Sequence, residues 1–240
     1  MVEGGQASSQ YAEQSMGRMK YSEEERNTII KNFLNSTREI IHSEGIDQVS
    51  IRKVAARAGL NSATMYLYFT DSDELITLAC MGYLEDYCNT LICEVPQMKT
   101  VYDAYMRAWE VFSIYAFQNP QVFHRLFFYP HSKPLKETAA RYFQIYPEML
   151  EQSEGLVHDT LLAGTLSARN MKMLRVICDD FHMDAHYADV INDFTICYFK
   201  NLLEEMPADA DEETVKAKTR QLLEALKFLF WGPRAEAHSC

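Results

Sequence analysis

Residues 50–69 read SIRKVAARAGLNSATMYLYF, and this stretch decides the fold. Ser50 can cap a first short helix, whose small alanine side chains allow a second helix to cross it closely. Gly59 supplies the positive φ that ends the first helix, and Asn61 can cap a second helix over residues 61–69. Two short capped helices around a glycine turn predict a helix-turn-helix, the motif that lays its second helix in the major groove of DNA.

The predicted second helix has an outer face that is unusual for a solvated helix. If Met65 and Phe69 form the inner face, 100° per residue puts Asn61 and Tyr68 at the edge of the core. The residues that then point outward are Ala63, Thr64, Tyr66 and Leu67. An outward leucine beside an alanine suits a major groove, where apolar groups meet thymine methyls. The neighbouring hydroxyl groups can reach phosphates or base edges.

Charge restricts where DNA can bind. The formal net charge is −11, so the chain as a whole repels DNA and a local basic site is needed. Residues 49–69 supply one, because they hold Arg52, Lys53 and Arg57 and no acidic residue. The free backbone amides after Ser50 and Asn61 are predicted phosphate contacts. The predicted DNA-binding residues are Ser50, Arg52, Asn61, Ser62, Ala63, Thr64, Tyr66, Leu67 and Tyr68.

The apolar periodicity predicts an all-α chain. Residues 1–21 show no periodicity and are expected to be a disordered leader. Residues 22–72 form the predicted DNA-binding domain of three helices, and residues 73–240 the predicted ligand-sensing and dimerisation domain. A fourth helix is expected to start at Asp71 or Ser72 and to run toward Leu91. Further helices are predicted over residues 100–118, 120–129, 134–150, 156–180, 184–205 and 211–230.

These motifs resemble the TetR/AcrR family of one-component bacterial regulators. The A-x-x-A-G turn of that family corresponds to residues 55–59, and its Y-x-Y-F ending to residues 66–69. The resemblance covers about residues 25–80 and implies a ligand-responsive regulator, usually a repressor, in which a bound ligand rotates the fourth helix. One departure is Ser72, where many members carry a lysine that contacts a phosphate. Its absence predicts a shallower salt dependence of DNA binding.

Aromatic residues are dense between residues 80 and 146. Tyr105, Trp109 and Phe112 share one helix face, which Tyr102 extends. Such a stripe packs helices more often than it binds a ligand, so plain core is the first interpretation. The resemblance implies instead that the bundle holds an effector, expected to be small and apolar or aromatic. The ligand-binding residues predicted on that basis are Tyr87, Tyr102, Tyr105, Met106, Trp109, Phe112, Phe127, Tyr142 and Tyr146.

The last two predicted helices carry more apolar surface than two terminal helices can bury alone. Pairing with a second copy gives a four-helix interface, and a homodimer would present two recognition helices to a palindromic operator. The alternative is that this surface packs against the body of its own chain.

Two other functions remain open. In one, the chain binds DNA under the control of a protein partner or of no effector. In the other, which has little support, it is a helical enzyme. No GxSxG, GxGxxG, phosphate-binding loop or HExxH motif occurs, so no catalytic residue and no cofactor is expected.

Metal binding and membrane insertion are not expected either. His182 and His186 have a spacing compatible with a metal, but Asp184 is predicted to cap a helix between them, so no metal site is expected. The sequence has neither a signal peptide nor an apolar stretch long enough for a membrane span. The chain is therefore expected in the cytoplasm.

Overall fold

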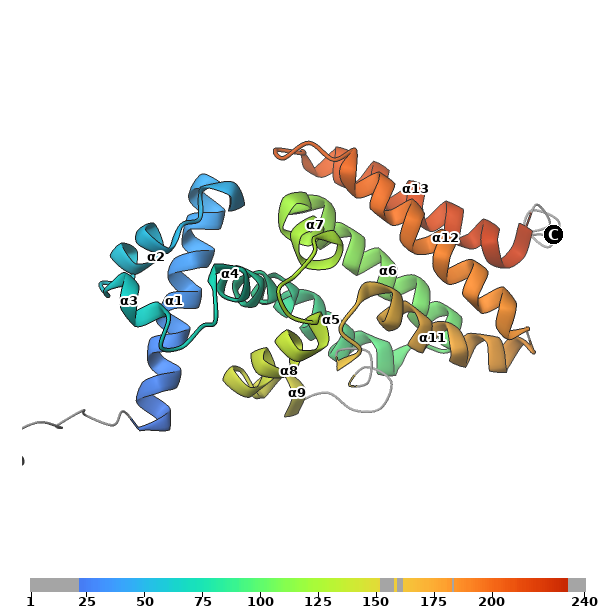
Figure 1. Cartoon of the computed structure of the whole chain (residues 1–240). Helices are drawn as coiled ribbons and strands as arrows, with labels where there is room; N and C mark the ends of the chain where they lie inside the picture. The colour runs from blue at the N-terminus through green and yellow to red at the C-terminus, as the bar shows by residue number, and fades with distance from the viewer. Residues whose placement is uncertain (1–21, 152–157, 159–161, 183, 233–240) are drawn as a thin grey trace, which may run out of the picture.

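The computed structural model describes residues 22–151, 158, 162–182 and 184–232, and every regular element within them is helical. The predicted leader lies outside these residues. Three helices form a small N-terminal bundle at one end of the molecule, and a fourth runs from it into a larger helical body (Figure 1). The last two helices lie along the far edge of that body. No helix among the described residues is long and apolar enough to cross a membrane.

The N-terminal bundle consists of α1 (Glu23–Glu44), α2 (Ile51–Arg57) and α3 (Ser62–Met65), with the single turn η1 (Ile46–Gln48) after α1. Ser22 and Glu25 close a capping box at the start of α1. Phe33 of α1 lies at the centre of the core, with its ring 5.9 Å from that of Phe69. Val54 and Met65 are fully buried beside it, so all three helices share one apolar core.

The helix α3 is shorter than the helix predicted over residues 61–69. The α-helix ends at Met65 rather than at Phe69, and the next three residues continue as tighter turns. The amide of Leu67 donates to the carbonyl of Thr64 at 3.1 Å, and that of Tyr68 to Met65 at 3.0 Å. These i to i+3 bonds are typical of a helix end that tightens as it terminates.

The predicted fourth helix is divided in two. It forms α4 (Ser72–Met81) and α5 (Glu85–Glu94), separated by the turn η2 (Gly82–Leu84). Arg38 of α1 explains the break, because its guanidinium Nε donates to the carbonyl of Ala79 at 3.2 Å. The same guanidinium fills the space that a Cβ on Gly82 would need. The carbonyl of Ala79 thus accepts both from the amide of Gly82 and from an arginine of another helix.

The larger body continues with α6 (Val101–Gln118), α7 (Pro120–Phe128), α8 (Leu135–Ile145) and α9 (Glu148–Glu151), and η3 (Val95–Gln97) precedes α6. The helix predicted over residues 134–150 is interrupted at Pro147, because a proline disfavours the helical conformation of the residue before it. Most of the segment between α9 and α11 lies outside the described residues.

The helices α11 (Leu166–Phe181), α12 (Ala185–Glu204) and α13 (Glu212–Trp231) complete the chain. Asp184 caps α12 by accepting from the amide of His186 at 2.8 Å, so His182 lies outside that helix. The helix α6 packs between α13 and α11, and α4 packs on α1, α7 and α8. The core of the body is strongly aromatic, and Phe112 on α6 is its centre. The rings in contact with it are those of Tyr87, Trp109, Phe123, Phe127 and Phe199.

Candidate functional site

The recognition helix presents an apolar outer face. Met65 and Phe69 are buried in the N-terminal core, whereas Tyr66 and Leu67 are 58% and 66% exposed. Ala63 is also exposed, and Ser62 and Thr64 are half-buried. A leucine that is two-thirds exposed has no packing role in this bundle. Its exposure leaves it available for contact with another molecule.

Three of the predicted DNA contacts are already engaged within the protein. The Oγ of Ser50 accepts from the amide of Lys53 at 3.4 Å, and the Oδ1 of Asn61 accepts from the amide of Ala63 at 2.8 Å. Both side chains therefore act as helix caps. Tyr68 is half-buried, and the guanidinium of Arg26 lies 5.8 Å from its ring centre.

The basic patch predicted from residues 49–69 is weaker than its sequence indicates. Lys53 lies 2.8 Å from the carboxylate of Glu44, and Arg57 lies 3.3 Å from the same group. The hydrogen bond from Lys53 lowers the pKa of Glu44, so this carboxylate is charged. The acid-free stretch receives these partners because α2 packs on the last turns of α1. Among the described residues, exposed Arg52 makes no ion pair.

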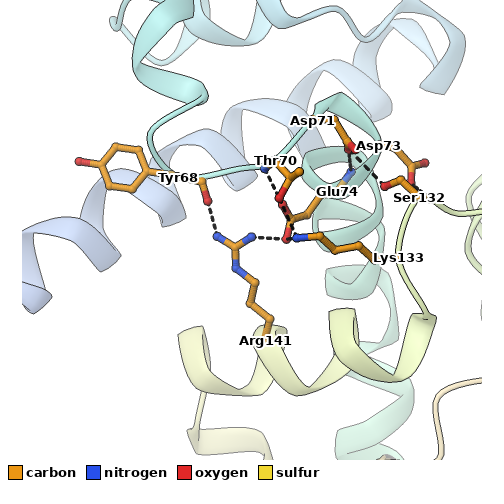
Figure 2. Close-up of polar contacts among 8 residues, drawn as sticks. All are labelled: Tyr68, Thr70, Asp71, Asp73, Glu74, Ser132, Lys133 and Arg141. Carbon is orange, nitrogen blue, oxygen red and sulfur yellow. Dashed lines mark hydrogen bonds and ion pairs between the residues drawn. The ribbon is translucent and has the colours of Figure 1, made fainter.

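Glu74 is a buried carboxylate where α4 leaves the N-terminal bundle. It is 3% exposed, and it accepts from the amide of Thr70 at 2.7 Å, from Lys133 at 2.8 Å and from Arg141 (Figure 2). Burial raises its pKa, but the hydrogen bonds from Lys133, Thr70 and Arg141 outweigh burial and lower the pKa to about 2. Glu74 is therefore ionised and connects the end of the N-terminal bundle to α8.

Asp73 makes a second connection beside it. It forms an ion pair with Arg125 of α7 and accepts from the amide of Ser132 at 2.7 Å. Asp71 caps α4 by accepting from the amide of Glu74 at 2.8 Å. Ser72 between them is exposed. The acidic residues around Ser72 thus take part in the contact between the start of α4 and the segment before α8 (Figure 2).

Sequence reasoning missed this junction. Lys133 and Arg141 are 59 and 67 residues away from Glu74 along the chain, and nothing in the local sequence marks them as its partners. The sequence signal for these contacts was indirect. Asp71, Asp73 and Glu74 form an acidic cluster at a helix start, and capping of that helix alone explains such a cluster.

The helical body contains a small cavity between α5, α6 and α11. It has about 20 Å³ of space, which is room for a single water molecule. Three of the predicted ligand-binding residues line it, namely Tyr87, Trp109 and Phe112. The other lining residues are Ala108, Leu166, Arg169, Asn170 and Met173.

A polar network borders this cavity. The indole Nε1 of Trp109 donates to Asn170 at 2.9 Å, Asn170 donates to Asn192 at 3.0 Å, and Asn192 donates to Ser167 at 2.8 Å. Tyr105 is fully buried close to Asn170, and burial raises its pKa. Neither its hydroxyl nor that of buried Thr195 makes a hydrogen bond to a described residue.

The structure does not bring the other predicted ligand residues into the cavity. Tyr142 accepts from Arg38 at 3.4 Å, and the ring of Tyr146 lies between the cationic groups of Lys31 and Arg38, at 4.7 and 5.4 Å. Both tyrosines therefore contact α1 of the N-terminal bundle. Tyr102 packs at the other end of α6, against rings of α11 and α13.

Two further predicted ligand residues, Met106 and Phe127, are half-buried. Phe127 remains close to the cavity, because its ring centre lies 5.6 Å from that of Phe112 and 5.6 Å from the guanidinium of Arg169. Met106 packs against the core but does not line the cavity.

The outer face of α12 and α13 is apolar and exposed. Its large residues are Tyr187, Val190, Phe194, Phe228 and Trp231. Phe194 is 60% exposed and borders a hollow of about 460 Å³, to which Cys197 and Tyr198 also contribute. The helices α12 and α13 lie side by side along one edge of the larger body (Figure 1).

Known proteins resemble both the N-terminal bundle and the whole fold. Residues 33–78 match the family model described as bacterial regulatory proteins, tetR family. An uncharacterised HTH-type transcriptional regulator of Haemophilus influenzae is 24% identical over 98 residues, 41% of this chain. The chain spans about half of that relative's length, since the match covers 52% of it.

Two solved structures resemble the larger part of the chain. FadR of Thermus thermophilus, a TetR family transcriptional repressor solved with lauroyl-CoA, is 11% identical with a TM-score of 0.55, over 85% of this chain and 94% of its own. RolR, solved with resorcinol, is 16% identical with a TM-score of 0.47, over 84% and 89%. The N-terminal helices therefore match the tetR family of bacterial regulatory proteins, and the larger part of the chain shares its fold with FadR.

Proposed function

We propose that this protein is a transcriptional repressor that binds a palindromic operator as a homodimer and releases it when a small apolar or aromatic effector binds. Members of the tetR family, which the N-terminal helices match, are DNA-binding regulators and not enzymes. In this proposal residues 22–72 contact DNA, and residues 73–240 bind the effector and a second copy.

The exposure of Leu67 and Tyr66 is the observation that carries the DNA-binding proposal. Burying a leucine on folding stabilises a protein by about 1.5–3 kcal/mol, and leaving it exposed forgoes that stabilisation. Thymine methyls in a major groove offer Leu67 an apolar partner, and the hydroxyls of Tyr66 and Thr64 offer polar contacts beside it. Arg52 adds a positive charge that no acidic side chain neutralises among the described residues.

The test begins with operator DNA selected by the protein from a random-sequence pool. Tyr66→Ala and Arg52→Ala should each weaken binding of that DNA by roughly ten-fold or more, measured by fluorescence anisotropy at fixed salt. Arg175→Ala is the matched control, because Arg175 is exposed on α11 of the other domain. The proposal fails if no sequence is enriched, or if all three variants bind equally.

The cavity and the buried hydroxyls near it support an effector site in the body. Its lining is aromatic and aliphatic, with Asn170 and Arg169 as polar groups. The buried hydroxyls of Tyr105 and Thr195 lie close to this wall, and a buried polar group without a hydrogen bond is costly. FadR, which shares the fold, was solved with an acyl-CoA, a ligand with an apolar chain. An aromatic effector with one hydroxyl or carbonyl group fits this chemistry.

A cavity of about 20 Å³ cannot hold such an effector without rearrangement, so binding requires that the side chains move apart. A fluorescence thermal-shift screen of substituted phenols and aromatic acids tests this. Binders should raise the melting temperature of the wild type but not of Trp109→Phe, in which the indole donor is lost. Equal shifts of the melting temperature in the wild type and in Trp109→Phe would contradict the proposed site.

The apolar face of α12 and α13 supports the dimer. Phe194→Asp should convert a dimer into a monomer in sedimentation velocity, because it buries a charge without a partner in the interface. Leu67→Asp is the control, since it adds the same charge on the opposite domain. A wild-type monomer at micromolar concentration would contradict this part of the proposal.

A further inference from the structure

Arg141 connects the sensing body to the recognition helix. It lies on α8, and its guanidinium donates both to the carbonyl of Tyr68 and to the carboxylate of Glu74 (Figure 2). The same group lies 5.3 Å from the ring centre of Phe69. Tyr68 and Phe69 end the turn that follows α3. One side chain of the body therefore contacts the carbonyl end of the DNA-binding element.

The first turn of α8 rests against Gly164. A Cβ on Gly164 would lie 2.9 Å from the backbone of Lys136, and the φ of Gly164 is +81°. Only glycine permits this close approach and this conformation without strain. The backbone of α8 thus lies in direct contact with the segment that leads into α11.

Gly164 is in turn bound to the wall of the cavity. Its carbonyl accepts from the Nε of Arg169 at 3.2 Å, and Arg169 lines the cavity beside Asn170. A continuous series of contacts therefore runs from the cavity through Arg169 and Gly164 to α8, and along α8 to Arg141. Each contact is short, so little displacement is absorbed along the way.

We propose that Arg141 is a positioning residue for the recognition helix, and that α8 is the lever through which the cavity controls that helix. This rests on the proposed function, because it names the route by which an effector regulates DNA binding. An effector that enlarges the cavity displaces Arg169, the displacement reaches α8 at Gly164, and Arg141 then pulls on or releases the carbonyl of Tyr68.

Hydrogen exchange of the DNA-free protein tests the positioning role. Arg141→Gln should speed the exchange of amides in residues 62–70 by roughly ten-fold, because the end of the recognition helix opens more often. Arg107→Gln is the matched control, since Arg107 pairs with Glu94 and Glu110 inside the body. Arg141→Lys keeps the charge but loses the forked geometry, and it should lie between wild type and Arg141→Gln. Equal exchange in all four proteins would overturn the positioning role.

A double-mutant cycle tests the lever. Gly164→Ala should displace α8 and speed exchange in residues 62–70, and adding Arg141→Gln should have little further effect. If Gly164→Ala does not fold, Arg169→Lys takes its place, because it removes the Nε that binds Gly164. The role of α8 would be refuted if the two substitutions had additive effects on exchange in residues 62–70. It would also be refuted if neither Gly164→Ala nor Arg169→Lys changed that exchange. This readout needs no DNA, so a wild type that selects no operator refutes the proposed function independently.

Discussion

The two ends of the molecule satisfy their polar groups in different ways. In the N-terminal bundle most are satisfied locally, as in the Ser22–Glu25, Asn61–Ala63 and Asp71–Glu74 caps, whose partners are two or three residues apart. In the body the Trp109–Asn170 bond joins residues 61 apart in sequence. The bundle is thus a locally specified scaffold with an exposed face. The body adds to its local caps a buried side-chain network that joins distant helices.

The largest expected effect concerns the long-range network. Asn170→Leu removes the acceptor of the Trp109 indole and the donor to Asn192, so two buried polar groups lose their partner. Unfolding free energy, measured in urea, should fall by about 3 kcal/mol. Asn89→Leu, on an exposed position of α5, should change it by less than about 0.5 kcal/mol. Equal effects would mean that the network adds nothing to the stability of the body.

A substitution on the exposed face of the bundle should change DNA affinity rather than stability. Leu67→Asp should leave stability nearly unchanged, because Leu67 is 66% exposed. Its affinity for selected operator DNA should fall roughly a hundred-fold, since a negative charge replaces an apolar contact beside the phosphates. Anisotropy titration measures the loss, and Ala168→Asp on α11 controls for the added charge. A large loss of stability would show that Leu67 packs within the protein after all.

Acid should weaken the junction between the two ends. The folded pKa of Glu74, about 2, lies below its ordinary value of 4.5, so its ion pairs stabilise the fold fully above that ordinary value. This contribution is lost as the pH falls from about 4.5 toward about 2. Urea unfolding of wild type and Glu74→Gln across this range should therefore converge. A stability difference that is independent of pH would contradict an ionised, paired Glu74.

The smallest expected effect is that of Ser72→Lys. An additional amine at the start of α4 should steepen the slope of log affinity against log salt by about one unit, because one more phosphate is neutralised. Affinity at two or more salt concentrations gives the slope. An unchanged slope would mean that Asp71 and Asp73 bind the new amine, and a Ser72→Gln variant would show whether side-chain length alone has an effect.

The sequence predicted the helices because the signals that start and end a helix are local. Caps, glycine turns and apolar periodicity act within a few residues, so Ser22, Gly59 and Asp184 marked helix boundaries correctly. It failed where a distant residue intervenes. The break between α4 and α5 requires Arg38, and the neutralised charges of Lys53 and Arg57 require Glu44, all brought in by the packing of α1.

The candidate effector site shows the same limit. Helical spacing put Tyr105, Trp109 and Phe112 on one face, and all three are buried. Helical spacing does not show which other helices pack against that face. The sequence therefore places Tyr142 and Tyr146 in the same pocket, whereas in the structure both contact Arg38 of α1. The DNA-contact and effector-contact residues remain predictions that the proposed variants test.

By itself the sequence determined the all-helical fold, the helix-turn-helix and the outward direction of Leu67, since each follows from contacts within one or two helical turns. Only the tertiary structure decided how the N-terminal bundle is joined to the larger body. Arg141, Glu74 and Gly164 lie far apart along the chain, and their contacts exist only because several helices pack at once. Local propensity carries no information about such a junction, because its energy comes from burial and charge pairing between distant segments.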